Sequence, residues 1–197
     1  MVLINESSIY LHCTGTKCWS HKGGRATEFR VASKGANLQL PGAVSAHFGA
    51  ILFEHRRSPL KKVDHDEWVL RVIEKAQSIV INSHDLVIVI DIAPSQRDLE
   101  VRIRSQLLES EAKILRLAPY STPLNPIELV WNQVKSYIKR QIARSITLIT
   151  NIPTELSQAE HRFALMENWS NGAFAFVTVQ SVFESDTVQN TLTQYVP

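Results

Sequence analysis

Two acidic residues, Asp91 and Glu128, lie at positions from which we expect their carboxylates to come together at one edge of a sheet. Asp91 directly follows an unbroken aliphatic run at residues 86–90, which is typical of a strand buried on both faces. Glu128 lies in the first turn of a predicted helix, behind a proline-rich loop. Two carboxylates at the carboxyl ends of strands are natural oxygen ligands for Mg²⁺. The same residue types also cap a helix or complement its dipole, so residue type alone leaves both interpretations open.

The segment around Glu128 favours the first interpretation. Residues 117–135 read LAPYSTPLNPIELVWNQVK. This segment resembles the PPYSPxLNPIExxWxxxK signature of the mariner-like DDE superfamily transposases, in which the glutamate is the third catalytic carboxylate. The resemblance therefore implies that role for Glu128.

Two further stretches resemble the same family. Residues 87–94, VIVIDIAP, are similar to its DNAPxH motif, so that Asp91 corresponds to the second carboxylate and Pro94 to the proline of the motif. Residues 3–7, LINES, are similar to the family's first strand, xxDESxxxL. The resemblance covers roughly residues 2 to 143.

The chemistry of that family is phosphodiester hydrolysis and strand transfer on a ribonuclease H-like fold. Two Mg²⁺ ions, roughly 3.5–4 Å apart, activate the nucleophile and stabilise the leaving oxygen. The resemblance implies Asp91 and Glu128 as catalytic residues and as ligands of Mg²⁺ or Mn²⁺, with DNA as the substrate. It also implies that the first of the three acids belongs at residue 5, where this chain carries Asn5.

The chain departs from the family pattern at that first acid. Asn5 offers one neutral oxygen and an N–H donor where an anionic ligand is needed, so we expect metal binding to be severely weakened. Glu6 is adjacent, but neighbouring residues on a strand point to opposite faces, so we do not expect it to substitute. Ile92 and Gln96 replace the family's asparagine and histidine, which removes hydrogen-bonding and titrating groups beside Asp91.

Basic residues gather in two places that suit phosphate contacts. A short run from Glu54 to Lys62 lies between a predicted strand and a predicted helix, and further lysines follow Glu128 on its own helix. Phosphate binding is one interpretation of these residues, and an ordinary solvated surface is the other. The candidate nucleic-acid-binding residues are Arg56, Arg57, Lys61, Lys62, Lys135 and Lys139.

A zinc site is a weaker candidate. It would use His12, Cys13, Cys18 and His21. Their spacing matches no structural zinc pattern, and small cysteines on a hairpin are typical of packing.

The composition excludes several classes of protein. The 197 residues are 44% hydrophobic and 20% charged, which is the ordinary globular range. The net charge of +2 is too small to indicate a nucleic-acid partner by bulk electrostatics, so DNA contacts must be local. No stretch has the length of a signal peptide or a spanning helix, and two cysteines do not make a disulfide framework. We expect an intracellular protein, nuclear in a eukaryote, with no membrane partner.

The hydrophobic pattern predicts the strands and helices around these acids. A strand pair is predicted at residues 2–4 and 9–13, interrupted by a polar run, and glycines punctuate a meander over residues 29–31 and 37–53. A buried strand is predicted at residues 86–90, and another short apolar strand at residues 112–117. Helices are predicted from Asp64 or Asp66 to Val80, and over residues 96–109, 126–144, 156–169 and 174–183, with Trp131 on a core stripe and a break at Asn171-Gly172.

These features together predict one ribonuclease H-like α/β domain at residues 1–150, with a mixed central sheet flanked by helices, and a helical C-terminal extension at residues 151–197. The function implied is a DDE-type transposase catalytic domain for Mg²⁺-dependent DNA strand cleavage and transfer, impaired by Asn5. The alternative is a non-catalytic remnant that binds DNA or a transposase partner. Complete family members carry helix-turn-helix modules ahead of this domain; because a strand begins at residue 2, we expect none here. The expected partners are DNA and either a second copy or a full-length transposase.

Overall fold

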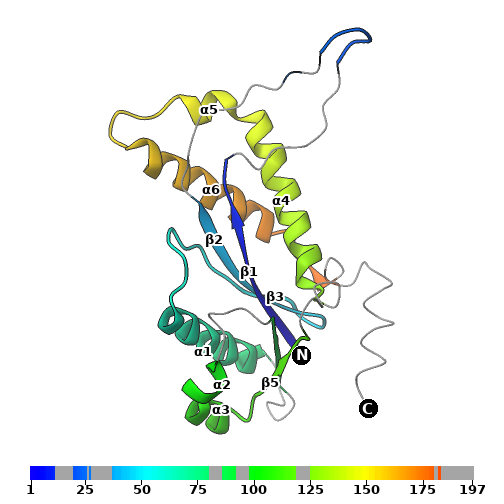
Figure 1. The fold of residues 1–197 in the computed structure, drawn as a ribbon, viewed down its shortest axis with the longest axis vertical. Helices are drawn as coiled ribbons and strands as arrows, with labels where there is room; N and C mark the ends of the chain where they lie inside the picture. The colour runs from blue at the N-terminus through cyan, green and yellow to red at the C-terminus, as the bar shows by residue number, and fades with distance from the viewer. Residues whose placement is uncertain are drawn as a thin grey trace.

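Five strands form one mixed sheet in the order β3-β2-β1-β4-β5, with helices on both of its faces (Figure 1). The computed structural model describes residues 1–11, 20–25, 27, 37–79, 86–91, 98–118, 125–179 and 182. The strands are β1 (Val2–Ile9), β2 (Leu38–Ser45), β3 (Gly49–Phe53), β4 (Val87–Ile90) and β5 (Lys113–Arg116). The helices are α1 (Lys62–Ile79), α2 (Leu99–Arg102), α3 (Arg104–Ser110), α4 (Ile127–Arg144), α5 (Ile146–Thr150) and α6 (Gln158–Phe174).

The central strand, β1, joins the antiparallel and parallel halves of the sheet. It pairs antiparallel with β2 along its whole length, and parallel with β4, which in turn pairs parallel with β5. The predicted interruption of this strand is wrong. Residues 5–8 continue the strand, because β2 supplies a ladder partner for each member of the polar run.

The predicted meander at residues 37–53 is confirmed as the β2–β3 hairpin. Gly49 opens β3 with a φ of 72°, a left-handed conformation that favours glycine. The ladder shifts between Ala43 and Val44, which is the irregularity that the glycine-rich pattern predicted. Residues 29–31 lie outside the described residues.

One face of the sheet packs against α1. The buried stripe of α1 contacts Val2 and Ile4 of β1. Leu99 of α2 and Ile103, the residue between α2 and α3, belong to the same core. The helix begins at Lys62, slightly before the predicted start, and the Asp64 carboxylate accepts a hydrogen bond from the Lys61 backbone N–H at 3.2 Å. The predicted helix at residues 96–109 is divided into α2 and α3 at Ile103.

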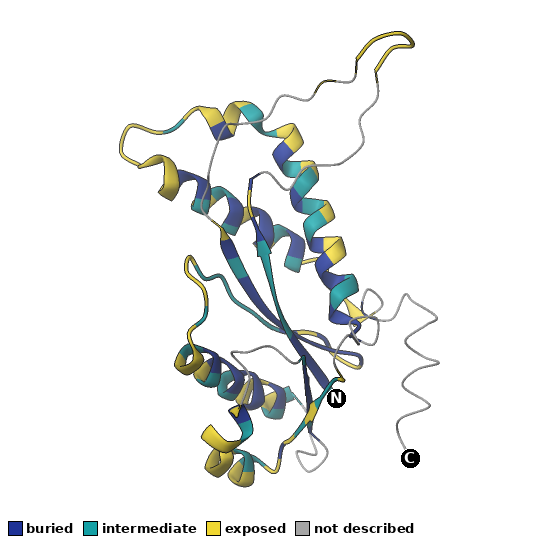
Figure 2. Ribbon diagram, viewed as in Figure 1, coloured by how far each residue is buried: buried dark blue, intermediate teal, exposed yellow. Residues whose placement is uncertain are grey.

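The other face of the sheet packs against α4 and α6. Figure 2 shows buried residues along β1 and β2 and along the facing sides of these two helices. The helix predicted at residues 126–144 is confirmed as α4. Its stripe meets the α6 side chains Met166, Trp169 and Ala173 in one hydrophobic cluster with Leu3 and Ile9 of β1.

The helix α6 is longer than its sequence pattern predicts. It begins with a capping box between Ser157 and Glu160. It then continues through the predicted break at Gly172, which is therefore wrong: a Cβ at this position would lie 2.9 Å from the Tyr137 hydroxyl, so the glycine serves close packing against α4. The predicted second helix does not begin at residue 174, since residues 175–178 form turns and irregular structure.

The C-terminal part of the chain shares the core of the sheet. Side chains of α6 and Val177 are buried in the same cluster as α4 and β1. The predicted division between residues 150 and 151 stays a prediction. Among the described residues, none of the helices has the length and apolar character needed to cross a membrane.

Candidate active site

The alternation of side chains along β1 sends residues 5 and 6 to opposite faces of the sheet. Leu3 and Ile9 are buried against α4, whereas Val2 and Ile4 are buried against α1. Since successive residues of a strand alternate, Asn5 lies on the α4 face and Glu6 on the α1 face. The side-chain contacts of both residues agree with this assignment.

Asn5 contacts Glu128 directly. Its Nδ2 donates a hydrogen bond to Glu128 Oε1 at 2.7 Å, and its Oδ1 accepts a hydrogen bond from the Glu6 backbone N–H at 2.6 Å. The second bond fixes the orientation of the amide, because only the oxygen can accept from a backbone N–H. The N–H₂ group is thereby directed at the carboxylate of Glu128.

Asp91 follows β4 by one residue and is half-buried. The parallel ladder pairs Val2 with Ile88 and Leu3 with Val89. Counting two residues further along both strands brings Asn5 level with Asp91. The alternation of β4 agrees, because Val89 is buried on the α4 face and Ile90 on the α1 face.

A glycine in β2 allows α4 to approach the face of the sheet beside Asn5. Gly42 pairs with Asn5 across the β1–β2 ladder. A Cβ at Gly42 would lie 2.6 Å from carbon atoms of both Phe53 and Trp131, and Trp131 is on α4 less than one turn from Glu128. The sequence pattern indicated a turn or bulge glycine at Gly42 and missed this role, because only the aromatic partners reveal it.

The described side chains do not fit a complete three-acid metal site. No three His, Cys, Asp or Glu side chains in the described ranges are grouped to hold a metal ion. At the position of the missing acid, the donor N–H₂ of Asn5 occupies an oxygen of Glu128 that a cation would need. Turning the amide to offer its oxygen would break the bond to Glu6 as well. The carboxylates of Asp91 and Glu128 remain as hard oxygen donors.

The side chain of Glu6 lies on the opposite face of the sheet, against α1. Its Oε1 lies 3.6 Å from Nε2 of His65, whose side chain is completely buried. Burial raises the pKa of Glu6. Burial is also the main cause that lowers the pKa of His65. The charge of Asp66 raises this pKa, and the charge of Arg102 lowers it. Glu6 therefore does not take the place of the missing acid.

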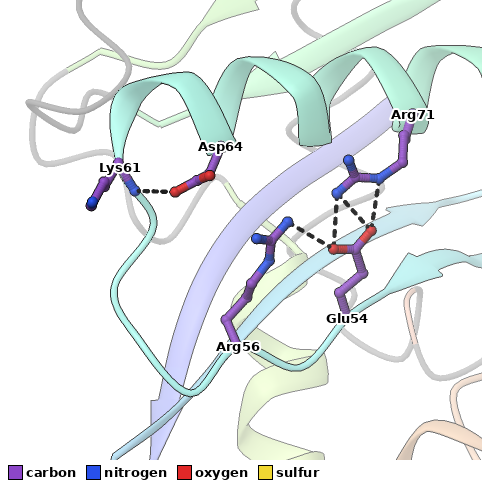
Figure 3. Close-up of polar contacts among 5 residues, drawn as sticks. All are labelled: Glu54, Arg56, Lys61, Asp64 and Arg71. Atoms are coloured by element: carbon purple, nitrogen blue, oxygen red, sulfur yellow. Dashed lines mark hydrogen bonds and ion pairs between the residues drawn. The ribbon is translucent and has the colours of Figure 1, made fainter.

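The two arginines of the basic run before α1 are held in ion pairs. Arg56 and Arg71 both contact Glu54, as Figure 3 shows, and Arg71 does so with two hydrogen bonds of 3.0 Å. Arg57 donates two hydrogen bonds, of 2.7 and 2.9 Å, to Glu167 of α6. A phosphate at Arg57 would have to compete with this carboxylate.

The remaining basic candidates are lysines at the start of α1 and on α4. Lys61 and Lys62 are exposed at the start of α1. Lys135 and Lys139 are half-buried on α4, seven and eleven residues after Glu128, which puts them on the same side of the helix. Their role in nucleic-acid binding stays a prediction.

Several predicted residues lie outside the described part of the chain. Among them are Ile92 and Gln96, and also His12, Cys13 and Cys18 of the zinc alternative. Trp131, predicted to be core, is 1% exposed, and that prediction is confirmed.

Comparison with known proteins agrees with this architecture. A family profile described as DDE superfamily endonuclease matches residues 1–149. No curated protein sequence matches the chain.

Solved structures of the mariner transposase Mos1 share the fold. A paired-end complex with Mn has a TM-score of 0.68 at 15% identity, covering 98% of this chain and 52% of that chain. The Mos1 strand transfer complex has a TM-score of 0.62 at 16% identity, covering 98% and 52%. A paired-end complex with the left transposon end has a TM-score of 0.62 at 16% identity, covering 96% and 51%. This chain therefore spans about half the length of these relatives, and the predicted ribonuclease H-like fold is confirmed.

Proposed function

Because the chain belongs to the DDE superfamily endonucleases, we propose that it is a DNA-binding transposase domain whose Mg²⁺- or Mn²⁺-dependent strand cleavage and transfer are impaired by Asn5. The observation that carries the proposal is the 2.7 Å hydrogen bond from Asn5 Nδ2 to Glu128 Oε1. Cleavage of this type needs anionic ligands to offset two divalent ions. A neutral donor at residue 5 removes one of three anions and occupies another.

DNA is the proposed partner for two reasons. The similar solved structures include Mos1 paired-end complexes, one of them with the left transposon end. In this chain, Lys135 and Lys139 lie on the side of α4 that carries Glu128, where phosphates beside the site would pass. Binding through lysines alone would be independent of sequence and would weaken with salt, by a log–log slope of about 0.9 per duplex phosphate contacted.

Plasmid nicking tests the impairment. We expect wild-type protein to bind plasmid DNA and leave it intact in Mg²⁺ or Mn²⁺, and Asn5→Asp to introduce metal-dependent nicks. Adding Glu128→Ala to Asn5→Asp should abolish the nicking, because the acids act as one unit. Equal nicking by wild type and Asn5→Asp at equal metal affinity would contradict the proposal.

Duplex binding tests the DNA partner separately. A filter-binding titration over a range of salt should give a steep loss of affinity in wild type and a shallower one in Lys135→Gln/Lys139→Gln. Absence of binding at low salt would refute DNA as the partner. A preference for one sequence by more than about 1–3 kcal/mol would indicate base readout that lysine–phosphate contacts do not provide.

A further inference from the structure

A groove of about 550 Å³ lies between the outer side of α4 and the end of α6, and the active-site chemistry does not use it. Its volume is within the range of roughly 300–1,000 Å³ that ordinarily holds a small organic ligand. Its lining includes Asn132, Ser136, Tyr137 and Arg140 from α4, and Phe176, which follows α6.

The polar residues of this groove continue the row that starts at the active site. Glu128, Asn132, Ser136 and Arg140 follow one another at four-residue spacing, so they form one ridge along α4. Between Glu128 and Arg140 this ridge extends roughly 18 Å along α4 and winds about a third of the way around it, at 3.6 residues per turn and a rise of about 1.5 Å per residue. A polymer that reaches Glu128 can therefore enter the groove by following α4.

The groove presents donors and a positive charge that none of the described residues pairs with. Within the part of the chain that the structure describes, the side chains of Asn132, Ser136 and Arg140 make no hydrogen bond or ion pair. The acidic side chains of α6 form hydrogen bonds with residues outside the groove: Glu160 with Ser157, and Glu167 with Arg57. The charge of the groove therefore favours an anionic ligand.

An aromatic ring forms one wall. Phe176 is 67% exposed, and its ring lies 5.8 Å from that of Tyr137 at an interplanar angle of 41°. A large apolar side chain that remains this exposed beside an arginine and an amide has the character of a stacking platform for a nucleobase.

We propose that this groove binds a single-stranded segment of DNA, with a base stacked on Phe176 and a phosphate paired with Arg140. The proposal rests on the proposed function and assigns a separate place on the surface to an unpaired strand. A duplex is too large for a groove of this volume, and its bases are not free to stack on a side chain. Asn132 and Ser136 provide hydrogen bonds to the strand between the active site and Phe176.

Binding of roughly 10-nucleotide oligothymidylate, followed by fluorescence anisotropy, tests the proposal. We expect Phe176→Ala to lower the affinity roughly 5- to 150-fold, the range for loss of one base–aromatic stack, and Phe176→Trp to retain it. Arg140→Gln should lower the affinity and reduce the salt slope by about 0.7, the value for one single-strand phosphate. The matched controls are Val101→Ala, an exposed apolar residue of α2, and Arg104→Gln, an exposed arginine of α3.

An abasic oligonucleotide of equal length separates stacking from charge. It should bind more weakly than oligothymidylate and should be insensitive to Phe176→Ala. Equal binding of the two oligonucleotides, or displacement of oligothymidylate by a polyglutamate peptide at similar concentration, would overturn the proposal in favour of a general anion or acidic-peptide site. A change in mass by light scattering in Phe176→Ala, without a change in oligonucleotide affinity, would overturn it in favour of self-association.

Duplex DNA in parallel distinguishes this inference from the proposed function. If duplex binds and the groove variants leave single-strand binding unchanged, the inference fails and the proposed function stands. If neither form of DNA binds, both fail.

Discussion

With asparagine at residue 5, the contact with Glu128 is a hydrogen bond between an amide and a carboxylate, and not a contact between two acids. With aspartate at residue 5, the carboxylate of Glu128 would face a second negative oxygen at the 2.7 Å now spanned by a hydrogen bond. Like charges this close cannot both remain ionised without a cation or a proton between them. The amide removes that need, because its N–H donates to the carboxylate of Glu128 without metal.

Asn5→Asp should therefore have opposite effects with and without metal. Without metal, we expect the free energy of unfolding to fall by about 1.5–3 kcal/mol, the usual contribution of a hydrogen bond to a charged group. With metal, calorimetric titration should show tighter Mg²⁺ or Mn²⁺ binding than wild type, because a third anionic oxygen is restored.

Ser7→Asp is the matched control for this change. It adds the same charge to the same strand two residues away, and we expect no gain in metal affinity. Equal affinity of wild type and Asn5→Asp would show that Asn5 is not the reason for weak metal binding.

His65 makes stability depend on pH. Both of its ring nitrogens are buried without a hydrogen-bond partner among the described residues, and its pKa is lowered, chiefly by burial. The unfolded chain, with an imidazole pKa near 6.5, therefore takes up a proton before the folded chain does as the pH falls. Stability contributed by neutral His65 is complete above the unfolded pKa and is lost as the pH falls from there toward the lower folded pKa.

We expect His65→Leu to flatten this dependence. Urea denaturation of wild type should give a smaller free energy of unfolding at pH 5.5 than at pH 7.5, with a smaller difference in His65→Leu. The exposed His47→Leu serves as a control and should behave as wild type does. An unchanged difference in His65→Leu would assign the effect to other groups, of which His55 also has a pKa lowered by burial.

Among the elements, α4 is positioned by aromatic packing as much as by its apolar stripe. Trp131 meets Phe53 edge-on at 5.7 Å, and Phe53 stacks on Phe174 at 4.2 Å. Gly42 leaves the space in which Trp131 and Phe53 come together beside Asn5. The distance between Asn5 and Glu128 thus depends on a glycine in another strand.

Gly42→Ala should weaken the contact between Asn5 and Glu128. Its Cβ would overlap two rings, and overpacking of this kind typically destabilises by about 1–3 kcal/mol. Chemical denaturation measures that loss, and the side-chain amide resonances of Asn5 should move in an NMR spectrum. Gly24→Ala, in an exposed turn, is the control and should change neither. Unchanged Asn5 resonances in Gly42→Ala would show that α4 is held by other contacts.

The elements show where sequence reasoning succeeds. The periodic stripe of α4 and the aliphatic run of β4 were predictable, because helix and buried-strand patterns are local. Continuity of β1 through residues 5–8 and of α6 through Gly172 was not, because each depends on a partner distant in sequence. In the candidate site, the sequence gives the residue types at positions 5, 91 and 128. It does not predict the hydrogen bond between Asn5 and Glu128, because these residues are distant in sequence. Nor does the sequence reveal the pairing of Arg57 with Glu167, 110 residues away.

Helix α6 completes the hydrophobic core that the sheet and α4 form. Met166 and Trp169 are 0% and 6% exposed, in the cluster that contains Trp131. Burial of such side chains is worth about 1.5–3 kcal/mol each, against a total stability of roughly 5–15 kcal/mol for an ordinary domain. The helix is therefore expected to be part of the folding unit.

A chain ending at Thr150 should lose cooperative folding. We expect its thermal transition to be broad and far below that of the full chain, with increased binding of a hydrophobic dye. Trp169→Ala in the full chain should give a smaller loss, of about 3–5 kcal/mol. A cooperative transition at the full-chain midpoint would instead establish residues 1–150 as an independent domain.

The late position of α6 has a consequence for synthesis on the ribosome. The β1–β3 sheet segment is complete once residue 53 has emerged, but the helix that closes one of its faces ends at Phe174. At a synthesis rate of roughly 5–20 residues per second, that face remains without α6 for about 6–24 s. During this interval the nascent chain displays a sheet face lined with Leu3, Ile9 and Leu40, which is the kind of surface that chaperones bind.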